Sequence, residues 1–203
     1  MQKLQDEYIE ELGGRTLMAP AVAGQILVKG DGSGIISEEK ATTYRSATAT
    51  LMYIMQYSRP EIYNATRGQL RHMKEPREAH AKALQTRMKY VVFTKNRRLV
   101  LAPTTLWNGE KDFKFRIHGR SGSDYTGNTD DRNSITGGRV FVNDSQVAFR
   151  SATQKTVTLS VTEAEGGAGV TCTQDMLYVF HLIASLGQKM ELPMLLEMDA
   201  AGS

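Results

Sequence analysis

Three acidic side chains stand where the sequence predicts that regular elements begin or end. Asp124 follows a predicted strand, Glu165 lies in the first turn of a predicted helix, and Asp199 ends the last predicted strand. Carboxylate oxygens are preferred ligands of Mg²⁺, and two such ions about 4 Å apart promote an in-line displacement at phosphorus. Because a chain with 22 acidic residues offers many such trios, spacing alone favours ordinary surface carboxylates over a metal site.

A strongly basic stretch lies in the middle of the chain. Residues 67–98 contain ten Lys or Arg and two acids, whereas residues 160–203 contain six acids and one base. Such a concentration favours a polyanionic partner such as nucleic acid, although charge alone is equally compatible with a solvated helix face. Six of these cations are candidate contacts to backbone phosphates: Arg67, Arg71, Lys74, Lys82, Arg87 and Lys89.

Composition narrows the class of protein. The chain has 203 residues, 40% hydrophobic and 23% charged, as in one large globular domain or two small ones. Its single cysteine, Cys172, excludes a disulfide framework, and no apolar run approaches the roughly 20 residues of a transmembrane helix. Residues 1–12 are acidic and lack the apolar core of a secretory signal. We therefore expect an intracellular protein, of the cytoplasm or the nucleus, with no membrane partner.

The first half of the chain predicts short helices. Ser37 is a suitable N-cap for a helix that ends near Ser58, and Pro60 suits the first position of the next helix. Short helices that follow each other so closely predict a small bundle. The elements expected here are an amphipathic segment at 1–12, a strand at 25–28, and helices at 37–58, 60–73 and 76–93.

The second half predicts a sheet with one long helix. Strands joined by turns form an antiparallel meander, and a strand that follows a helix returns parallel to the first strand. The fold class that we expect is therefore α+β, with a helical bundle followed by a mixed sheet. The elements expected here are strands at 98–102, 113–120, 139–142, 147–149 and 156–160, a helix at 162–186, and a strand at 193–198.

Four sequence motifs occur in the order and spacing of a known family. The chain resembles copia-type retrotransposon Pol polyproteins in TYRSATATLMYIMQYSRPEI (43–62), GRSGSDYTGNTDDRNSITGGRVF (119–141), QKTVTLSVTEAE (154–165) and ELPMLLEMDAAGS (191–203). The resemblance covers nearly the whole chain from about residue 15. It implies that residues 1–105 are the thumb-like helical end of a reverse transcriptase. It also implies that residues 106–203 begin an RNase H-like domain that is incomplete at its C-terminal end.

The resemblance also implies a chemistry. RNase H domains cut the RNA strand of an RNA–DNA hybrid with two Mg²⁺ or Mn²⁺ ions held by carboxylates. Matched position by position, the family's first catalytic Asp falls on Gly122, its helix Glu on Glu165, and its next Asp on Asp199. Asp124 matches a second family Asp, two residues after the first. The expected cofactor is therefore Mg²⁺ or Mn²⁺, and the expected partner is an RNA–DNA hybrid.

Departures from the family pattern point to an impaired enzyme. Gly122 offers no carboxylate, and Asp124 lies about 6.5 Å further along the strand. The glycines at 166, 167 and 169 weaken the helix that carries Glu165, and the paired-Asp motif of a polymerase is absent. We therefore expect nucleic-acid binding with a damaged nuclease site. Two alternatives remain: an active ribonuclease that uses Asp124, and a decayed element fragment that serves as a protein-interaction domain.

Overall fold

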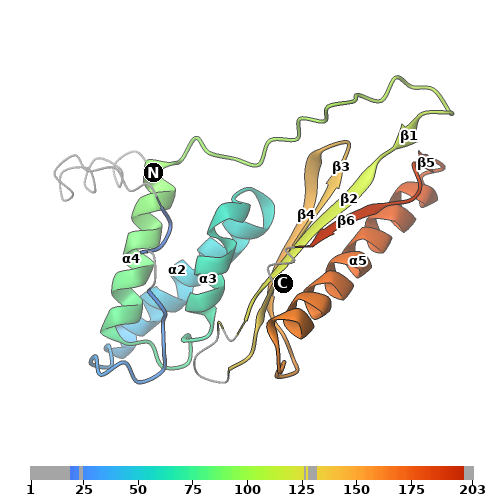
Figure 1. Ribbon diagram of the computed structural model, residues 1–203. Helices are drawn as coiled ribbons and strands as arrows, with labels where there is room; N and C mark the ends of the chain where they lie inside the picture. Colours follow the sequence, from blue (N-terminus) through green and yellow to red (C-terminus); the bar gives the residue numbers. More distant parts are fainter. Residues whose placement is uncertain (1–18, 23–24, 126, 128–131, 199–203) are drawn as a thin grey trace. The chain divides into compact units, whose positions relative to one another are not determined.

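The computed structural model describes residues 19–22, 25–125, 127 and 132–198 (Figure 1). The chain divides into two compact units, Met1–Leu99 and Val100–Ser203. The amphipathic segment predicted at 1–12 and the candidate ligand Asp199 lie outside the described residues. None of the helices in the described ranges combines the length and apolarity needed to traverse a lipid bilayer.

The first unit is helical, as predicted. Helix α2, Glu38–Tyr57, begins at Ser37, whose side chain accepts a hydrogen bond from the Lys40 backbone N–H at 3.5 Å. A 3₁₀ turn at Pro60–Ile62 then starts the next segment, where the missing N–H of proline is tolerated. Two further helices follow, α3 at Tyr63–Leu70 and α4 at Glu78–Phe93.

Apolar side chains from all these helices form the core of this unit. Tyr44 and Leu51 of α2 pack with Ile62, Leu84 and Tyr90, each of them 6% exposed or less. The helix contacts link α2 to both α3 and α4. Burial of this set, at roughly 25 cal/mol per Å² of apolar surface, holds together helices that are too short to be stable alone.

Three predicted strands are wrong, and each for a visible reason. Residues 25–28 form no ladder, because the Leu27 and Val28 carbonyls accept hydrogen bonds from histidine rings instead. Residues 98–102 have no neighbouring strand in the part of the chain that the structure describes, and Val100 is left 63% exposed. Residues 156–160 are loop, because Ser160 caps the following helix by accepting from the Glu163 N–H at 3.1 Å.

The second unit contains a four-stranded sheet in the order β4-β3-β2-β6. Strands β2 (Ile117–Asp124), β3 (Ile135–Val142) and β4 (Ser145–Thr153) form the predicted antiparallel meander. Strand β6, Leu195–Met198, pairs parallel with β2, which confirms the prediction for the last strand. Two short strands, β1 (Lys114–Phe115) and β5 (Lys189–Met190), form a separate parallel pair.

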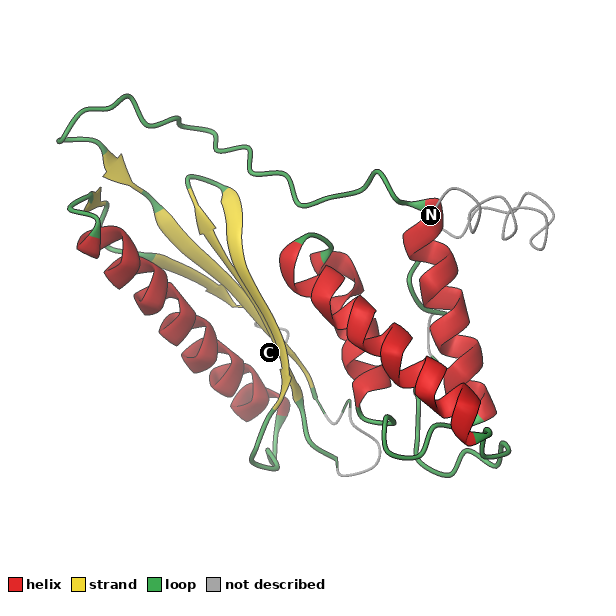
Figure 2. Ribbon diagram, turned by 180° about the vertical axis from the view of Figure 1, so that it is seen from behind, coloured by secondary structure: helices red, strands yellow, loops and turns green. Residues whose placement is uncertain are grey.

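One long helix, α5 at Val161–Ser185, lies along one face of this sheet (Figures 1 and 2). Cys172, Met176 and Val179 of α5 pack against Ile117 and Val140 of the strands to form the second core. The α+β class is thus confirmed, and the arrangement of this unit is compatible with an RNase H-like fold. The packing of α5 on β2 also brings the first turns of the helix close to the end of that strand.

Candidate functional site

Glu165 is anchored to the end of β2. Its Oε1 accepts hydrogen bonds from the backbone N–H of Ser123 at 2.9 Å and from the Ser123 hydroxyl at 2.7 Å. Its other oxygen, Oε2, is buried and has no hydrogen-bond partner within the described part of the chain. One carboxylate oxygen is therefore satisfied by the protein itself, and the second is left for a ligand.

The end of β2 and the first turns of α5 meet at a corner that holds Glu165. Position 122 contributes only backbone atoms to this corner. Gly122 lies in β2 directly before Ser123 and pairs with Gly137 of β3. Side chains alternate between the two faces of a strand, so Ser121 and Ser123 point to the α5 side while positions 122 and 124 point to the other side. The hydroxyl of Ser121 is buried on the α5 side and has no hydrogen-bond partner among the described residues.

Asp124 is directed away from Glu165. It is exposed at the end of β2, and its backbone carbonyl accepts from the Gly127 N–H at 3.2 Å in the turn that follows. Its carboxylate packs against Gly127, where an added Cβ would overlap it. Strand alternation gives Asp124 the face of Gly122, not that of Ser123, which holds Glu165.

Strand β6 leads toward the same corner. Its register sets Met198 opposite Ser121 of β2, and Met198 also lies close to Gly169 in α5. Asp199 is the next residue along the chain, but it lies outside the described residues. The structure thus brings the end of β6 beside the end of β2 and leaves the contribution of Asp199 a prediction.

The described residues do not fit a two-metal site. No group of three or more His, Cys, Asp or Glu gathers within the described ranges. Two Mg²⁺ ions about 4 Å apart repel each other strongly and need anionic oxygens between and around them. At this corner Glu165 provides one buried oxygen that the protein leaves unpaired, and Gly122 provides none.

The six predicted phosphate contacts separate into two groups. Lys74 and Lys82 are exposed, and Arg67 and Arg71 are half-buried near the end of α3. Arg87 and Lys89, in contrast, are only 3% and 8% exposed. Buried cations cannot reach a phosphate unless the helical unit opens. Arg87 and Lys89 are therefore not part of the exposed basic surface.

Arg87 belongs to the buried stripe of α4. Its Nε donates to the Pro20 carbonyl at 3.2 Å, and burial lowers the pKa of its guanidinium to about 10, a shift that the nearby Tyr44 hydroxyl opposes. The stripe repeats at helical spacing through Leu84, Arg87 and Val91. That spacing was the sequence signal for a buried Arg87, and a count of charges overlooks it.

Comparison with known proteins sets the chain beside retrotransposon polyproteins. It is 28% identical over 162 residues to the retrovirus-related Pol polyprotein from transposon RE1 of Arabidopsis thaliana, a match that covers 80% of this chain and 10% of that polyprotein. It is 28% identical over 193 residues to the Pol polyprotein from transposon TNT 1-94 of Nicotiana tabacum, covering 90% of this chain and 14% of that polyprotein. The chain thus spans far less than two thirds of the length of these polyproteins.

A shorter protein also matches. The chain is 28% identical over 140 residues to the secreted RxLR effector protein 161 of Plasmopara viticola, a match that covers 69% of this chain and 93% of that protein. No protein-family model matches the chain, and no solved structure matches it. The matches to Pol polyproteins nevertheless confirm the resemblance found in the sequence motifs: the chain is similar to copia-type retrotransposon Pol polyproteins over 80–90% of its length.

Proposed function

We propose that the chain is a Pol-derived, RNase H-like fragment that binds nucleic acid, with an RNA–DNA hybrid as its preferred partner, and that its nuclease site is impaired. The observation that carries this proposal is the state of Glu165. Ser123 occupies one oxygen of this carboxylate, and the adjacent position 122 is glycine. A corner with one unpaired carboxylate oxygen offers too little charge for two metal ions.

The binding half of the proposal is supported by the exposed cations of the helical unit. Lys74 and Lys82 are exposed, and Arg67 and Arg71 are half-buried in the same unit. Cations of this kind contact phosphates without regard to base sequence, and binding releases counterions. We therefore propose that the affinity for nucleic acid is electrostatic and depends little on base sequence.

If a metal is bound, Mg²⁺ or Mn²⁺ is the proposed ion, because carboxylate oxygen is the available ligand. Glu165 Oε2 would be its ligand, together with Asp199 if that side chain reaches the same corner. Asp124 is a less suitable ligand, because its carboxylate packs against Gly127. An active ribonuclease based on Asp124 therefore has weaker support than an impaired one.

A second candidate is a role through a protein partner. The observation in its favour is the match to the effector from Plasmopara viticola, of which 93% is covered. A protein of that length, related to this chain, bears a name that refers to neither a polymerase nor a nuclease. Under this alternative the exposed cations would be a solvated surface, and nucleic acid would not bind.

Titration of a labelled RNA–DNA hybrid by the full chain, followed by fluorescence anisotropy at several salt concentrations, separates the two candidates. We expect the affinity for the hybrid to fall as the salt concentration rises. On duplex DNA the slope of log affinity against log salt concentration is about −0.9 for each phosphate that is neutralised, and we expect a slope of this order here. A hybrid that does not bind at low salt would refute the proposal and leave the protein-partner role.

A further inference from the structure

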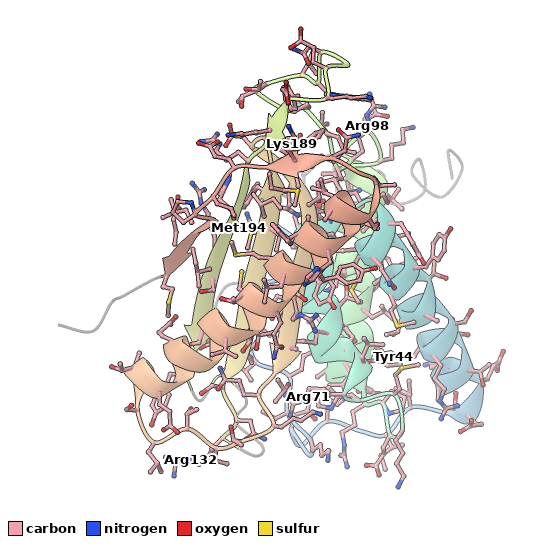
Figure 3. The ribbon with its side chains drawn as sticks, turned by 90° about the vertical axis from the view of Figure 1, so that its right-hand side faces the viewer. Tyr44, Arg71, Arg98, Arg132, Lys189 and Met194 are labelled. Atoms are coloured by element: carbon pink, nitrogen blue, oxygen red, sulfur yellow. The ribbon has the colours of Figure 1, made fainter. Side chains whose placement is uncertain are left out.

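Four cations, two of them already among the predicted phosphate contacts, line a cavity of about 410 Å³ in the helical unit. Lys29, Arg71, Lys74 and Arg77 line it, and Figure 3 labels Arg71, the C-cap residue of α3. Lys29 and Arg77 are not among the predicted phosphate contacts. A cavity of this volume suits a ligand the size of a nucleotide better than a single ion.

The walls of this cavity are held together by two stacked histidines. The rings of His72 and His80 lie 4.0 Å apart between centroids, and both are almost fully buried. His72 Nε2–H donates to the Leu27 carbonyl at 3.2 Å, and His80 Nε2–H donates to the Val28 carbonyl at 3.0 Å. The loop that carries Lys29 is thereby fixed against the α3–α4 connection.

The same connection also holds Arg77 in place. Its guanidinium donates to the Ser33 carbonyl at 2.9 Å and to the Glu75 carboxylate at 2.8 Å, and its backbone N–H donates to His80 Nδ1 at 3.1 Å. Glu75, the one acid of the lining, is therefore already paired. Preorganised cations bind an anion with a smaller loss of side-chain entropy than mobile ones.

The charge of the lining distinguishes between kinds of phosphate. The charged residues of the lining, four cations and one carboxylate, sum to a formal charge of +3. A phosphodiester within a strand carries one negative charge, whereas a phosphate monoester carries roughly 1.5 to 2 near neutral pH and presents three acceptor oxygens. The concave, cationic lining therefore suits a terminal phosphate monoester better than a phosphodiester, whose strand must continue in both directions.

We propose that this cavity binds a phosphate monoester, either that of a free nucleotide or the 5′-phosphate that ends a nucleic-acid strand. The strand-end form rests on the proposed function, whereas the free-nucleotide form does not. Lys29, from the loop before α2, and Lys74, from the α3–α4 connection, both line the cavity and would contact the phosphate, while the guanidinium of Arg77 is held by Ser33 and Glu75.

Calorimetric titration of the full chain with adenosine 5′-monophosphate and with adenosine tests the pocket alone. We expect the monophosphate to bind at least about ten-fold more tightly than the nucleoside, because charge-assisted hydrogen bonds form only to the phosphate. Lys29→Ala combined with Lys74→Ala should remove this preference. The matched variant Lys40→Ala with Lys155→Ala loses the same charge from exposed positions outside the cavity and should keep it. Equal binding by both double variants would overturn the proposal.

Two hybrids that differ only in a 5′-phosphate test the strand-end form. Tighter binding of the phosphorylated hybrid, lost in the Lys29/Lys74 variant, would support it. An equal loss of affinity for both hybrids in that variant would place a backbone diester in the cavity and overturn it. If neither hybrid binds while the monophosphate does, the proposed function fails and the pocket stands as a nucleotide site.

Discussion

Glu165 of α5 and Ser123 of β2 are joined by two hydrogen bonds to the same carboxylate oxygen, at 2.9 and 2.7 Å. This pair ties the first turns of the long helix to the end of the strand on which it packs. The carboxylate that the family resemblance assigns to metal binding therefore has a structural partner here. Its second oxygen remains buried and unpaired within the described part of the chain.

Ser123→Ala should destabilise the second unit. The hydroxyl donates to a charged carboxylate, and loss of such a bond lowers the free energy of unfolding by about 1.5–3 kcal/mol. Urea denaturation followed by circular dichroism measures the change. Thr173, an exposed residue of the same helix, donates its hydroxyl only to the Gly169 carbonyl of that helix at 2.9 Å, so Thr173→Ala should change stability by less than about 0.5 kcal/mol. Equal effects of the two substitutions would show that the Ser123 bond contributes nothing.

Two glycines of the second unit should respond in opposite directions to alanine. A Cβ at Gly166 in α5 meets nothing within 4 Å, so Gly166→Ala should raise the free energy of unfolding by about 0.5–1 kcal/mol. A Cβ at Gly119 in β2 would lie 2.5 Å from Met176 Sδ and 3.0 Å from Cys172 Sγ, so Gly119→Ala should lower it by about 1–3 kcal/mol. Denaturation midpoints that move together would contradict the packing of α5 on β2.

Removal of exposed charge should weaken hybrid binding in a way that depends on salt. Lys74→Gln with Lys82→Gln removes two exposed cations, so the log–log salt slope should become shallower by about 0.9 for each lost phosphate contact. Anisotropy titrations of the variant and the parent chain provide the two slopes. Lys40→Gln with Lys155→Gln is the charge-matched control. An unchanged slope in the Lys74/Lys82 variant would remove these residues from the interface.

Alkaline pH should destabilise the helical unit through Tyr44. Burial raises the pKa of Tyr44 to about 12, although the charge of Arg87 acts in the opposite direction. The folded chain then keeps the proton between pH 10 and 12, whereas the unfolded chain, with a tyrosine pKa of about 10, has lost it. Tyr44 therefore contributes stability that is complete below about pH 10 and is lost as pH rises to about 12.

Arg87 changes the free energy of unfolding in the opposite direction over the same pH range, because burial lowers the pKa of its guanidinium to about 10. The difference in unfolding free energy between the parent chain and Tyr44→Phe isolates the tyrosine. We expect that difference to change by about 2 kcal/mol, against the parent chain, between pH 10 and 12. A constant difference would mean that Tyr44 ionises equally in the folded and the unfolded chain.

The helices and the meander were predictable because their signals are local. Ser37 and Pro60 mark helix starts whatever the rest of the chain does, and turn residues between strands enforce antiparallel pairing. The segments wrongly predicted as strands carry the same local signals but have no neighbouring strand among the described residues. Val100 belongs to a β-prone run, yet no strand of the described residues lies beside it. Strand formation depends on a neighbouring strand, and the residue types of one segment do not show whether such a neighbour exists.

The candidate site was predictable only in part. The resemblance pointed to Glu165, and α5 does carry it to the end of β2. Ser123 as its partner depends on which face of β2 meets the helix, and this requires the packing of the two elements. The cavity beside Arg71 depends on a loop held by two histidine rings, and their spacing across Pro76 conveyed no such contact.

A cleavage assay in which binding is measured on the same labelled RNA–DNA hybrid, with Mg²⁺ or Mn²⁺ present, tests most directly whether the chain binds nucleic acid with an impaired nuclease site. We expect the chain to bind the hybrid and to leave its RNA strand intact. Gly122→Asp should increase metal affinity at the Glu165 corner, because it restores a carboxylate at the position that lacks one. Mg²⁺-dependent cleavage by the unmodified chain, abolished by Asp124→Asn, would contradict the account and establish an active ribonuclease.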